Sequence, residues 1–156
     1  MRFFKLYFFL LIPLAVWGGK VEITSDTMKA MEQKKEIHFI GNVTIKQQKS
    51  WIHGNKVVVL FNENNETKQY DAIGNVTFEL REHNHFYKGK AYKVTYYPKR
   101  AVYILKGNAV IEDMFNKRHI DGDFITLNLT SGLADVQGAK KKPVKFIFES
   151  EKKKSK

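Results

Sequence analysis

The chain has 156 residues, and none of them is cysteine. A disulfide, a thiol nucleophile and a thiolate metal site are therefore excluded. Proline is nearly absent from the interior of the chain, where only Pro98 lies between Pro13 and Pro143. Because proline cannot donate to a strand ladder, this long stretch is free to form a sheet. No long helical periodicity is present, so we expect a β fold that is held by its apolar core.

Side chains that carry chemistry are also sparse. His83 and His85 form a His-x-His pair, but the sequence places no third ligand beside them, so no metal site is expected. The sequence contains no glycine-rich phosphate loop and suggests no Ser-His-Asp arrangement. Carboxylates are present, but no pair is placed to face one cleft, as a sugar-directed enzyme requires. We predict that the protein is not an enzyme and has no catalytic residue, metal or cofactor.

Positive charge is concentrated at the end of the chain, although the formal net charge of the whole is +11. Residues 140–156 contain eight lysines and two glutamates, whereas residues 20–139 contain 17 basic and 14 acidic side chains. The folded part is thus nearly balanced, and no aromatic platform accompanies a basic stripe. Nucleic acid is therefore not an expected partner. Residues 149–156 are expected to form a disordered, lysine-rich tail.

Residues 1–19 have the plan of a secretory signal peptide. Basic residues precede an apolar run from Leu6 to Val16, which is too short to span a bilayer comfortably. We predict cleavage near Gly18 and export of the chain, which leaves residues 20–148 as one domain. Because Trp17 is unusual at a cleavage site, an uncleaved N-terminal anchor is the alternative.

One stretch of sequence occurs three times. The segment FIGNVTI at 39–45 returns as AIGNVTF at 72–78 and as LKGNAVI at 105–111, so its glycine recurs every 33 residues. A fixed period of this size indicates stacked supersecondary units. Apolar residues stand two and four places on either side of each glycine, which is the alternation of a strand with one buried face.

A second series of glycines, at positions 54, 89 and 122, precedes further alternating runs such as Tyr92, Val94 and Tyr96. Each repeat is therefore predicted to contain two strands and two turns, or about nine to eleven strands in all. The glycines of the first series share the parity of the apolar residues. They indicate either a bulge or tight packing, or else room for a ligand between two sheet walls.

The two ends of the repeating sheet are predicted to be open edges. Lys20–Thr24 forms the early edge, and a strand with Val144, Phe146 and Phe148 forms the late one. Such edges can pair with another chain by strand addition. Between the early edge and the first repeat, residues 25–35 fit either one helical turn or a polar hairpin.

Asn-x-Thr segments occur at Asn42, Asn65, Asn75 and Asn128. Three of them lie within strand repeats, and Asn65 lies in a polar loop, where it is expected to be exposed. The residues around Asn65 read Glu-Asn-Asn-Glu-Thr. They resemble the extended acceptor pattern of some bacterial glycosylation systems.

Several of these segments, taken in order, resemble the LptA (OstA-like) family of periplasmic lipopolysaccharide-transport proteins. The resemblance is carried by VxIxSD at 21–26, FxGNVxI at 39–45, LxGNA at 105–109 and HIDGDxIT at 119–126. It covers residues 21–138, which lie behind a signal peptide and before a lysine-rich tail. The middle repeat differs from the family in its loop lengths.

The resemblance implies an antiparallel β-jellyroll of repeated strand pairs, V-shaped in section and with open strand edges. It implies a periplasmic carrier that binds lipopolysaccharide through the acyl chains of lipid A. It also implies head-to-tail assembly into a bridge from the inner to the outer membrane, with an LptC-like inner-membrane partner and an LptD-like outer-membrane partner.

The acyl-chain site is predicted partly from the resemblance and partly from the strand alternation. By alignment of the opening motif and the second repeat, Val21, Ile23 and Phe78 fall where the family lines its cavity. The alternation extends the lining to other inward positions. The full set is Val21, Ile23, Phe39, Val43, Ile45, Val57, Val59, Phe61, Val76, Phe78, Val94, Ile111, Ile125 and Leu127.

Two alternatives remain open. LptC-like relatives share the fold but keep an N-terminal anchor, as an uncleaved segment 1–19 would provide. A purely structural scaffold, in which the repeats only extend a sheet, would need no cavity and would bind no lipid.

Overall fold

The computed structural model describes residues 20–82 and 84–151, so the predicted signal peptide lies outside the described residues. Within the described part the chain forms ten strands and no helix, which confirms the predicted all-β class. The strands are β1 (Glu22–Thr24), β2 (Thr27–Met31), β3 (Glu36–Gln47), β4 (Ser50–Phe61), β5 (Thr67–Glu82), β6 (His85–Tyr97), β7 (Val102–Asp113), β8 (Arg118–Asn128), β9 (Leu133–Gln137) and β10 (Lys145–Phe148).

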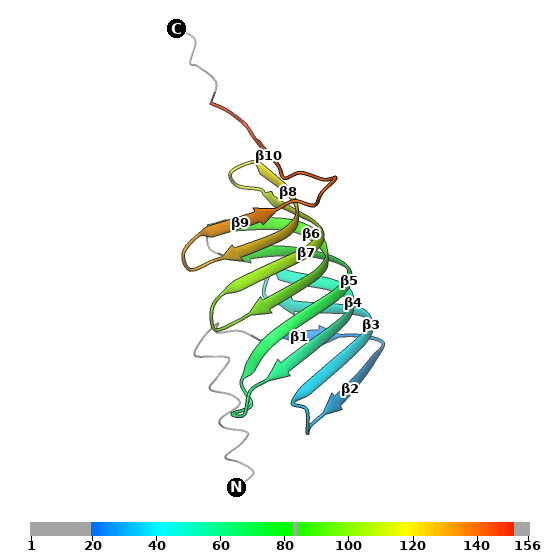
Figure 1. Ribbon diagram of the computed structural model, residues 1–156. Coiled ribbons are helices and arrows are strands. Elements are labelled where there is room, and N and C mark those ends of the chain that lie inside the picture. Colours follow the sequence, from blue (N-terminus) through cyan, green and yellow to red (C-terminus); the bar gives the residue numbers. More distant parts are fainter. Residues whose placement is uncertain (1–19, 83, 152–156) are drawn as a thin grey trace.

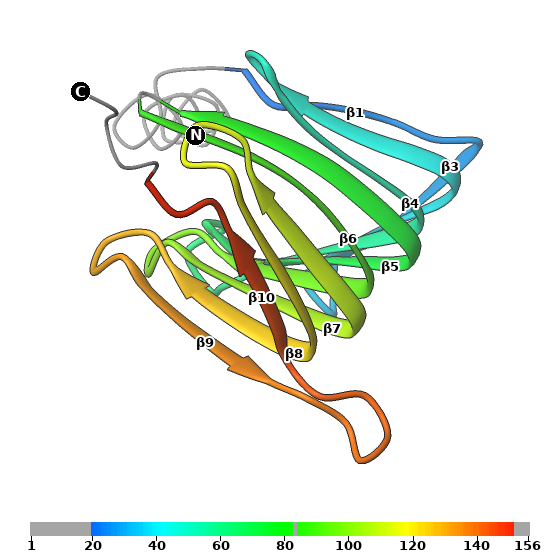
Figure 2. The same cartoon turned by 90° about the horizontal axis from the view of Figure 1, so that it is seen from above.

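Six long strands, β3 to β8, pair antiparallel in chain order and form the body of one open sheet (Figure 1). Each long strand bends near its middle, so its two halves belong to different walls. In the first wall, β1 pairs with the second half of β3, and β10 pairs with the first half of β8. In the second wall, β2 pairs with the first half of β3, and β9 pairs with the second half of β8. Figure 2 shows the two walls meeting at the bends and diverging on the other side, as the V-shaped section requires.

Gly-Asn pairs make the bends in β3, β5 and β7. In β5, Gly74 and Asn75 have φ angles of +89° and +47°, and the register with β6 shifts between Ile73 and Val76. Glycine and asparagine tolerate this left-handed region better than other residues do. The pairs at 41–42 and 107–108 have nearly the same angles. The repeated glycine is therefore a bulge residue, as the first interpretation predicted.

Neighbouring side chains occupy the space beside these glycines. A Cβ added at Gly74 would lie 2.6 Å from Nδ2 of Asn55. Asp26 and Tyr92 fill the equivalent positions beside the other two corner glycines. The glycines thus allow the corner of one strand to pack against its neighbour. The alternative interpretation, in which they make room for a ligand, is wrong.

Residues 25–35 form a polar hairpin and not a helical turn. Residues 27–31 of β2 pair in register with residues 36–40 of β3. The backbone N–H of Asp26 donates to the Gly41 carbonyl at 2.8 Å, which fixes the chain at the corner of the V. The early part of the chain therefore contributes one edge strand to each wall, β1 to the first and β2 to the second.

Candidate functional site

The inner faces of the two walls carry the apolar residues that the alternation predicts. Eleven of the fourteen predicted site residues belong to one buried cluster, in which each is no more than 9% exposed. Ile23 and Phe61 pack against this cluster and are half-buried. Val21 lies just before β1, outside the cluster, and is 41% exposed. The eleven buried residues are Phe39, Val43, Ile45, Val57, Val59, Val76, Phe78, Val94, Ile111, Ile125 and Leu127.

The strand register arranges the inward side chains in rows that cross the sheet, because directly paired residues share a face. One row crosses the first wall from β1 to β10, and it consists of Ile23, Ile45, Ile52, Phe78, Gly89, Ile111, Ile120 and Phe146. The facing row crosses the second wall from β3 to β9, and it consists of Phe39, Val57, Ala72, Val94, Leu105, Ile125 and Val136. We call the space between these rows the trough.

Three tyrosines form part of a further row on the second wall, and the predicted set did not include them. Tyr70, Tyr96 and Tyr103 pair across β5, β6 and β7, and their rings stack with centroid distances of 6.1 Å and 4.3 Å. Burial raises the pKa of each hydroxyl, so all three tyrosines are neutral near pH 7. The alternation around the repeated glycines had already placed Tyr70 and Tyr103 on the buried face.

Side chains fill most of the trough. Val43, Val57 and Val76 are fully buried between the walls, as expected for close packing in a protein interior. The central trough is therefore a packed apolar core in this structure. A ligand chain would have to part the two walls to enter it.

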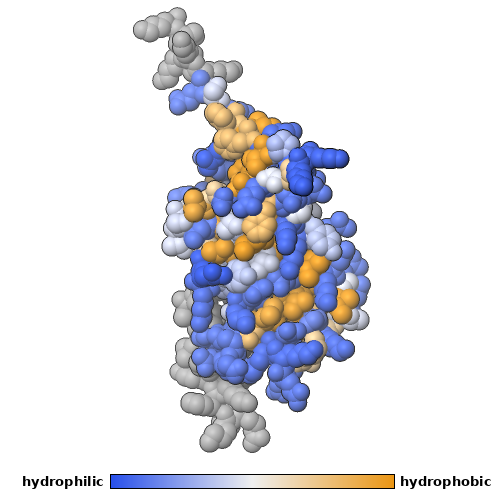
Figure 3. Space-filling model, in the orientation of Figure 1, coloured by the Kyte–Doolittle hydropathy of each residue, from blue (hydrophilic) through white to orange (hydrophobic). Residues whose placement is uncertain are grey.

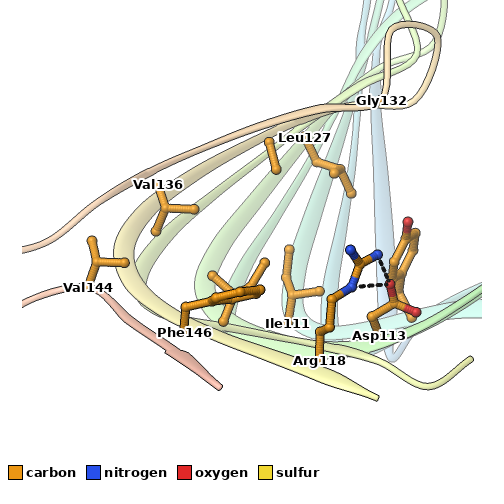
Figure 4. Close-up of a pocket in the computed structure, with 11 residues that line it drawn as sticks. Ile111, Asp113, Arg118, Leu127, Gly132, Val136, Val144 and Phe146 are labelled. Carbon is orange, nitrogen blue, oxygen red and sulfur yellow. Dashed lines mark hydrogen bonds and ion pairs between the residues drawn. The ribbon is translucent and has the colours of Figure 1, made fainter. Parts of the chain in front are cut away.

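Open apolar space is present near the C-terminal end of the sheet. A cavity of about 390 Å³ lies between β9 and β10, which pair with opposite halves of β8 and diverge from each other (Figure 4). Of the predicted site residues, only Ile111 and Leu127 line it. Its other apolar lining side chains are Ile120, Ala134, Val136, Val144 and Phe146. Figure 3 shows hydrophobic surface reaching the exterior at this end of the molecule.

An ion pair stands at one side of the cavity. The Arg118 guanidinium donates to Oδ2 of Asp113 through Nη2 at 2.6 Å and through Nε at 3.2 Å. Asn116 donates to the same carboxylate through its backbone N–H and its side-chain Nδ2. Burial raises the pKa of Asp113, but these hydrogen bonds outweigh it and hold the pKa below its ordinary value. Asp113 therefore stays ionised, although it is only 6% exposed.

A second charged group lies on the outer face of the first wall. Nε2 of His119 is 3.0 Å from Oδ2 of Asp121, and Nδ1 is 2.5 Å from Oε1 of Glu112. The hydrogen bond to Asp121 raises the pKa of His119, burial opposes this shift, and Glu112 adds to it. Both ring nitrogens can donate only when the imidazole is protonated. His119 pairs with Ile147 of the edge strand β10.

No group of His, Asp and Glu side chains among residues 20–82 and 84–151 is arranged to hold a metal ion. His83, one half of the His-x-His pair, lies outside the described residues. In the same described ranges no helix is long and apolar enough to cross a membrane.

Comparisons with known proteins agree with this architecture. A family model described as "LptA/(LptD N-terminal domain) LPS transport protein" matches residues 22–133. A solved structure of LptH, the LptA-homologous periplasmic component of the lipopolysaccharide transport device of Pseudomonas aeruginosa, superposes with a TM-score of 0.73. That match is 12% identical in sequence and covers 84% of this chain and 96% of LptH. No curated protein matches the sequence.

The chain therefore belongs to the LptA/LptD N-terminal domain family of lipopolysaccharide transport proteins. Its fold is that of LptH. The family match and the shared fold together support an LptA-like protein, as the sequence motifs predict.

Proposed function

We propose that the protein is a periplasmic carrier that binds the acyl chains of lipid A between its two walls. In this proposal the carrier passes lipopolysaccharide along a head-to-tail assembly from the inner to the outer membrane. The observation that carries the proposal is the apolar cavity between β9 and β10, whose lining includes Ile111 of one row of the trough and Val136 of the facing row. Its volume, about 390 Å³, lies within the range of roughly 300–1,000 Å³ that is common for ligand sites.

The cavity is the natural entrance for an acyl chain, because the centre of the trough is filled. Phe146 and Val144 lie on its wall, and both are exposed. Covering apolar surface yields roughly 25 cal/mol per Å² before the cost of ordering the ligand is subtracted. An acyl chain that extends further inward would separate the facing rows and replace their mutual contacts with contacts to lipid. Of the predicted site residues, Ile111 and Leu127 would touch the chain first.

Lysine side chains at the outer rims of the two walls, where the V opens, suit the head group of the lipid. Lys49 and Lys117 lie in the turns that end the first wall, and Lys35 and Lys99 lie in those of the second. An ammonium group is a suitable partner for a phosphate, since hydrogen bonds between charged groups are stronger than neutral ones. We propose that these rims face the phosphates of lipid A while the acyl chains lie between the walls.

The open edges support head-to-tail assembly. β1 and β2 end the sheet on one side, and β9 and β10 end it on the other, one strand per wall at each end. Addition of β10 to β1 of a second copy, with β9 beside β2, would continue both walls and the trough between them. An interface of this kind is heterologous, so it can propagate into a filament. The same edges would pair with an LptC-like protein at the inner membrane and an LptD-like protein at the outer one.

Native mass spectrometry of the full chain, expressed with its own leader, tests the proposal. We expect loss of residues 1 to about 18, adducts with added lipopolysaccharide, and a ladder of oligomers that grows with concentration. A processed monomer that never takes up lipid would contradict the carrier and leave the structural scaffold. An intact N-terminus found only in the membrane fraction would favour the anchored LptC-like alternative.

A further inference from the structure

We propose that Asn65 is a site of N-linked glycosylation, which accepts a sugar from a donor carried on a lipid pyrophosphate. The acceptor motif is Asn65-Glu66-Thr67, and the acidic residue Glu63 lies two places before the asparagine. The proposal depends on export of the chain, because sugar transfer of this kind takes place on exported proteins. It does not depend on lipid binding.

The structure separates Asn65 from the other three Asn-x-Thr asparagines. Asn42 and Asn75 are bulge residues in the middle of β3 and β5, so the backbone of their motifs is held in the strand ladders, although both side chains are exposed. Asn128 ends β8, and its Oδ1 accepts hydrogen bonds from the backbone N–H groups of Thr130 and Ser131. Asn65 and Glu66 lie in the turn that joins β4 to β5, and only Thr67 of the motif lies in a strand, as the first residue of β5. A transferase can approach a turn of this kind without opening the sheet.

Local hydrogen bonds place Asn65 at the tip of this turn. Oδ1 of Asn62 accepts from the backbone N–H groups of Asn64 at 2.9 Å and Glu66 at 3.0 Å. The backbone N–H of Asn65 donates to the Asn62 carbonyl at 2.9 Å. Asn65 adopts a left-handed φ of +62° and is exposed. Asn62 therefore builds the turn, and modification of the Asn65 side chain would leave these contacts in place.

The side chain of Asn65 makes a contact, and that contact does not involve its reactive atom, Nδ2. Lys35 donates to Oδ1 of Asn65 through Nζ at 2.8 Å, and this bond leaves Nδ2 out of the contact. Nδ2 is the nitrogen that would carry the sugar. Lys35 is partly exposed, and its side chain can move away at little cost, since isolated surface contacts contribute little to stability.

The transfer forms one bond at Asn65 and breaks one bond in the donor. Nδ2 of Asn65 attacks the anomeric carbon of the donor sugar and forms the N–C bond. The bond between that carbon and the pyrophosphate oxygen breaks, and the lipid pyrophosphate leaves as an anion. Nδ2 loses one proton to a base of the transferase. No oxidant or reductant is required.

A sugar at this position is compatible with the rest of the fold. The turn lies between β4 and β5, which are inner strands in the sheet order, and it is at the rim of the second wall (Figure 1). The edge strands β1, β2, β9 and β10 therefore stay uncovered. The glycan would border the mouth of the V and would not block strand addition at either end.

Peptide mass spectrometry of the full chain, purified from the cells that produce it naturally, tests the proposal. We expect the peptide that contains Asn65 to carry a glycan, and we expect that mass to be lost in Asn65→Gln. Glu63→Gln should also lose the glycan if the transferase recognises the acidic residue, whereas the matched variant Asn75→Gln should keep it. An unmodified Asn65 in the natural protein, or sugar on Asn42, Asn75 or Asn128 in its place, would overturn the proposal.

The same sample separates this proposal from the carrier function. Lipopolysaccharide binding is measured on the glycosylated protein and on the Asn65→Gln variant. A glycan on Asn65 in a protein that binds no lipid would retain the modification site and reject the carrier. Lipid binding by a protein whose Asn65 is unmodified would retain the carrier and reject the modification site.

Discussion

The ring of Phe78 lies directly over Gly89 on the neighbouring strand. The two residues are cross-strand partners in β5 and β6, and a Cβ added at Gly89 would overlap Cζ of Phe78 and lie 2.5 Å from the Val110 carbonyl oxygen. Gly89 is the residue without a side chain in the row that crosses the first wall. The aromatic ring of Phe78 takes the place of the missing side chain, so the row stays continuous.

Gly89→Ala should destabilise the fold through this overlap. The added methyl meets backbone on one side, so it cannot be accommodated by a side-chain rotation alone. Overpacking of this kind typically costs about 1–3 kcal/mol, which a urea unfolding curve resolves as a lower midpoint at unchanged slope. Gly54→Ala is the matched control, because its new methyl would lie 3.4 Å from Cγ2 of Val76. An equal loss in both variants would show that the Phe78–Gly89 contact is not the cause.

Phe146→Ser should weaken lipopolysaccharide binding without unfolding the protein. Phe146 lines the cavity beside β10 and is 51% exposed, so its removal leaves little empty core. Burying a phenylalanine side chain contributes about 1.5–3 kcal/mol, and we expect the dissociation constant to rise at least about tenfold. Phe115→Ser is the control, because Phe115 is 59% exposed and lies in the β7–β8 turn. Fluorescence titration with both variants measures the difference, and equal affinities would place the acyl chains elsewhere.

A pair of engineered cysteines should show whether the copies assemble head to tail. The chain has no cysteine of its own, so Glu22→Cys in β1 and Lys145→Cys in β10 introduce the only thiols. Both strands belong to the first wall, at its opposite ends. If β10 of one copy adds to β1 of the next, a short bifunctional thiol linker should produce a ladder of trimers and larger species in the double variant. Each single variant should stay monomeric, because its thiols lie at the same end of every copy and do not meet; a double variant that gives no species beyond a dimer would contradict head-to-tail growth.

The stability of the β7–β8 pairing should depend on pH through His119, because its imidazole lies between Glu112 on β7 and Asp121 on β8. Its pKa is raised in the folded protein by Asp121 and Glu112, so its contribution is complete below the unfolded pKa of about 6.5 and is lost as pH rises through the folded value. The groups that face it are Glu112 on β7 and Asp121 on β8, and Lys145 on β10 pairs with Asp121.

The matched variant for this test is His119→Gln, which cannot be protonated. We expect the wild type to exceed it in melting temperature below the unfolded pKa, and the two proteins to converge at high pH. Hydrogen exchange of the β7 and β8 amides around Glu112 and His119 measures the same change locally. A difference that grows with rising pH would have the wrong sign and would reject the protonated bridge.

Much of the fold can be read from the alternation around each glycine of the 33-residue repeat. Residues such as Val43, Val76 and Ile111 were placed on the inner face because a strand has a strict two-residue period, and all three are buried. The same counting fails at a bulge. Counted from Gly89, Tyr92 shares the parity of Val94, yet Tyr92 lies on the outside of the corner beside Gly107 and is exposed. One inserted residue reverses the faces on either side of it.

The sequence by itself determined the all-β class, the repeating strand pairs, the two open edges and the family, because each depends on local patterns or on motifs in order. The tertiary structure alone decided that the centre of the trough is filled and that open space remains beside β9 and β10. That space exists because Val136, Val144 and Phe146 come from separate segments whose walls diverge at the end of the sheet. Such a cavity depends on long-range pairing and on the angle between two walls, and no local period in the chain encodes either of them.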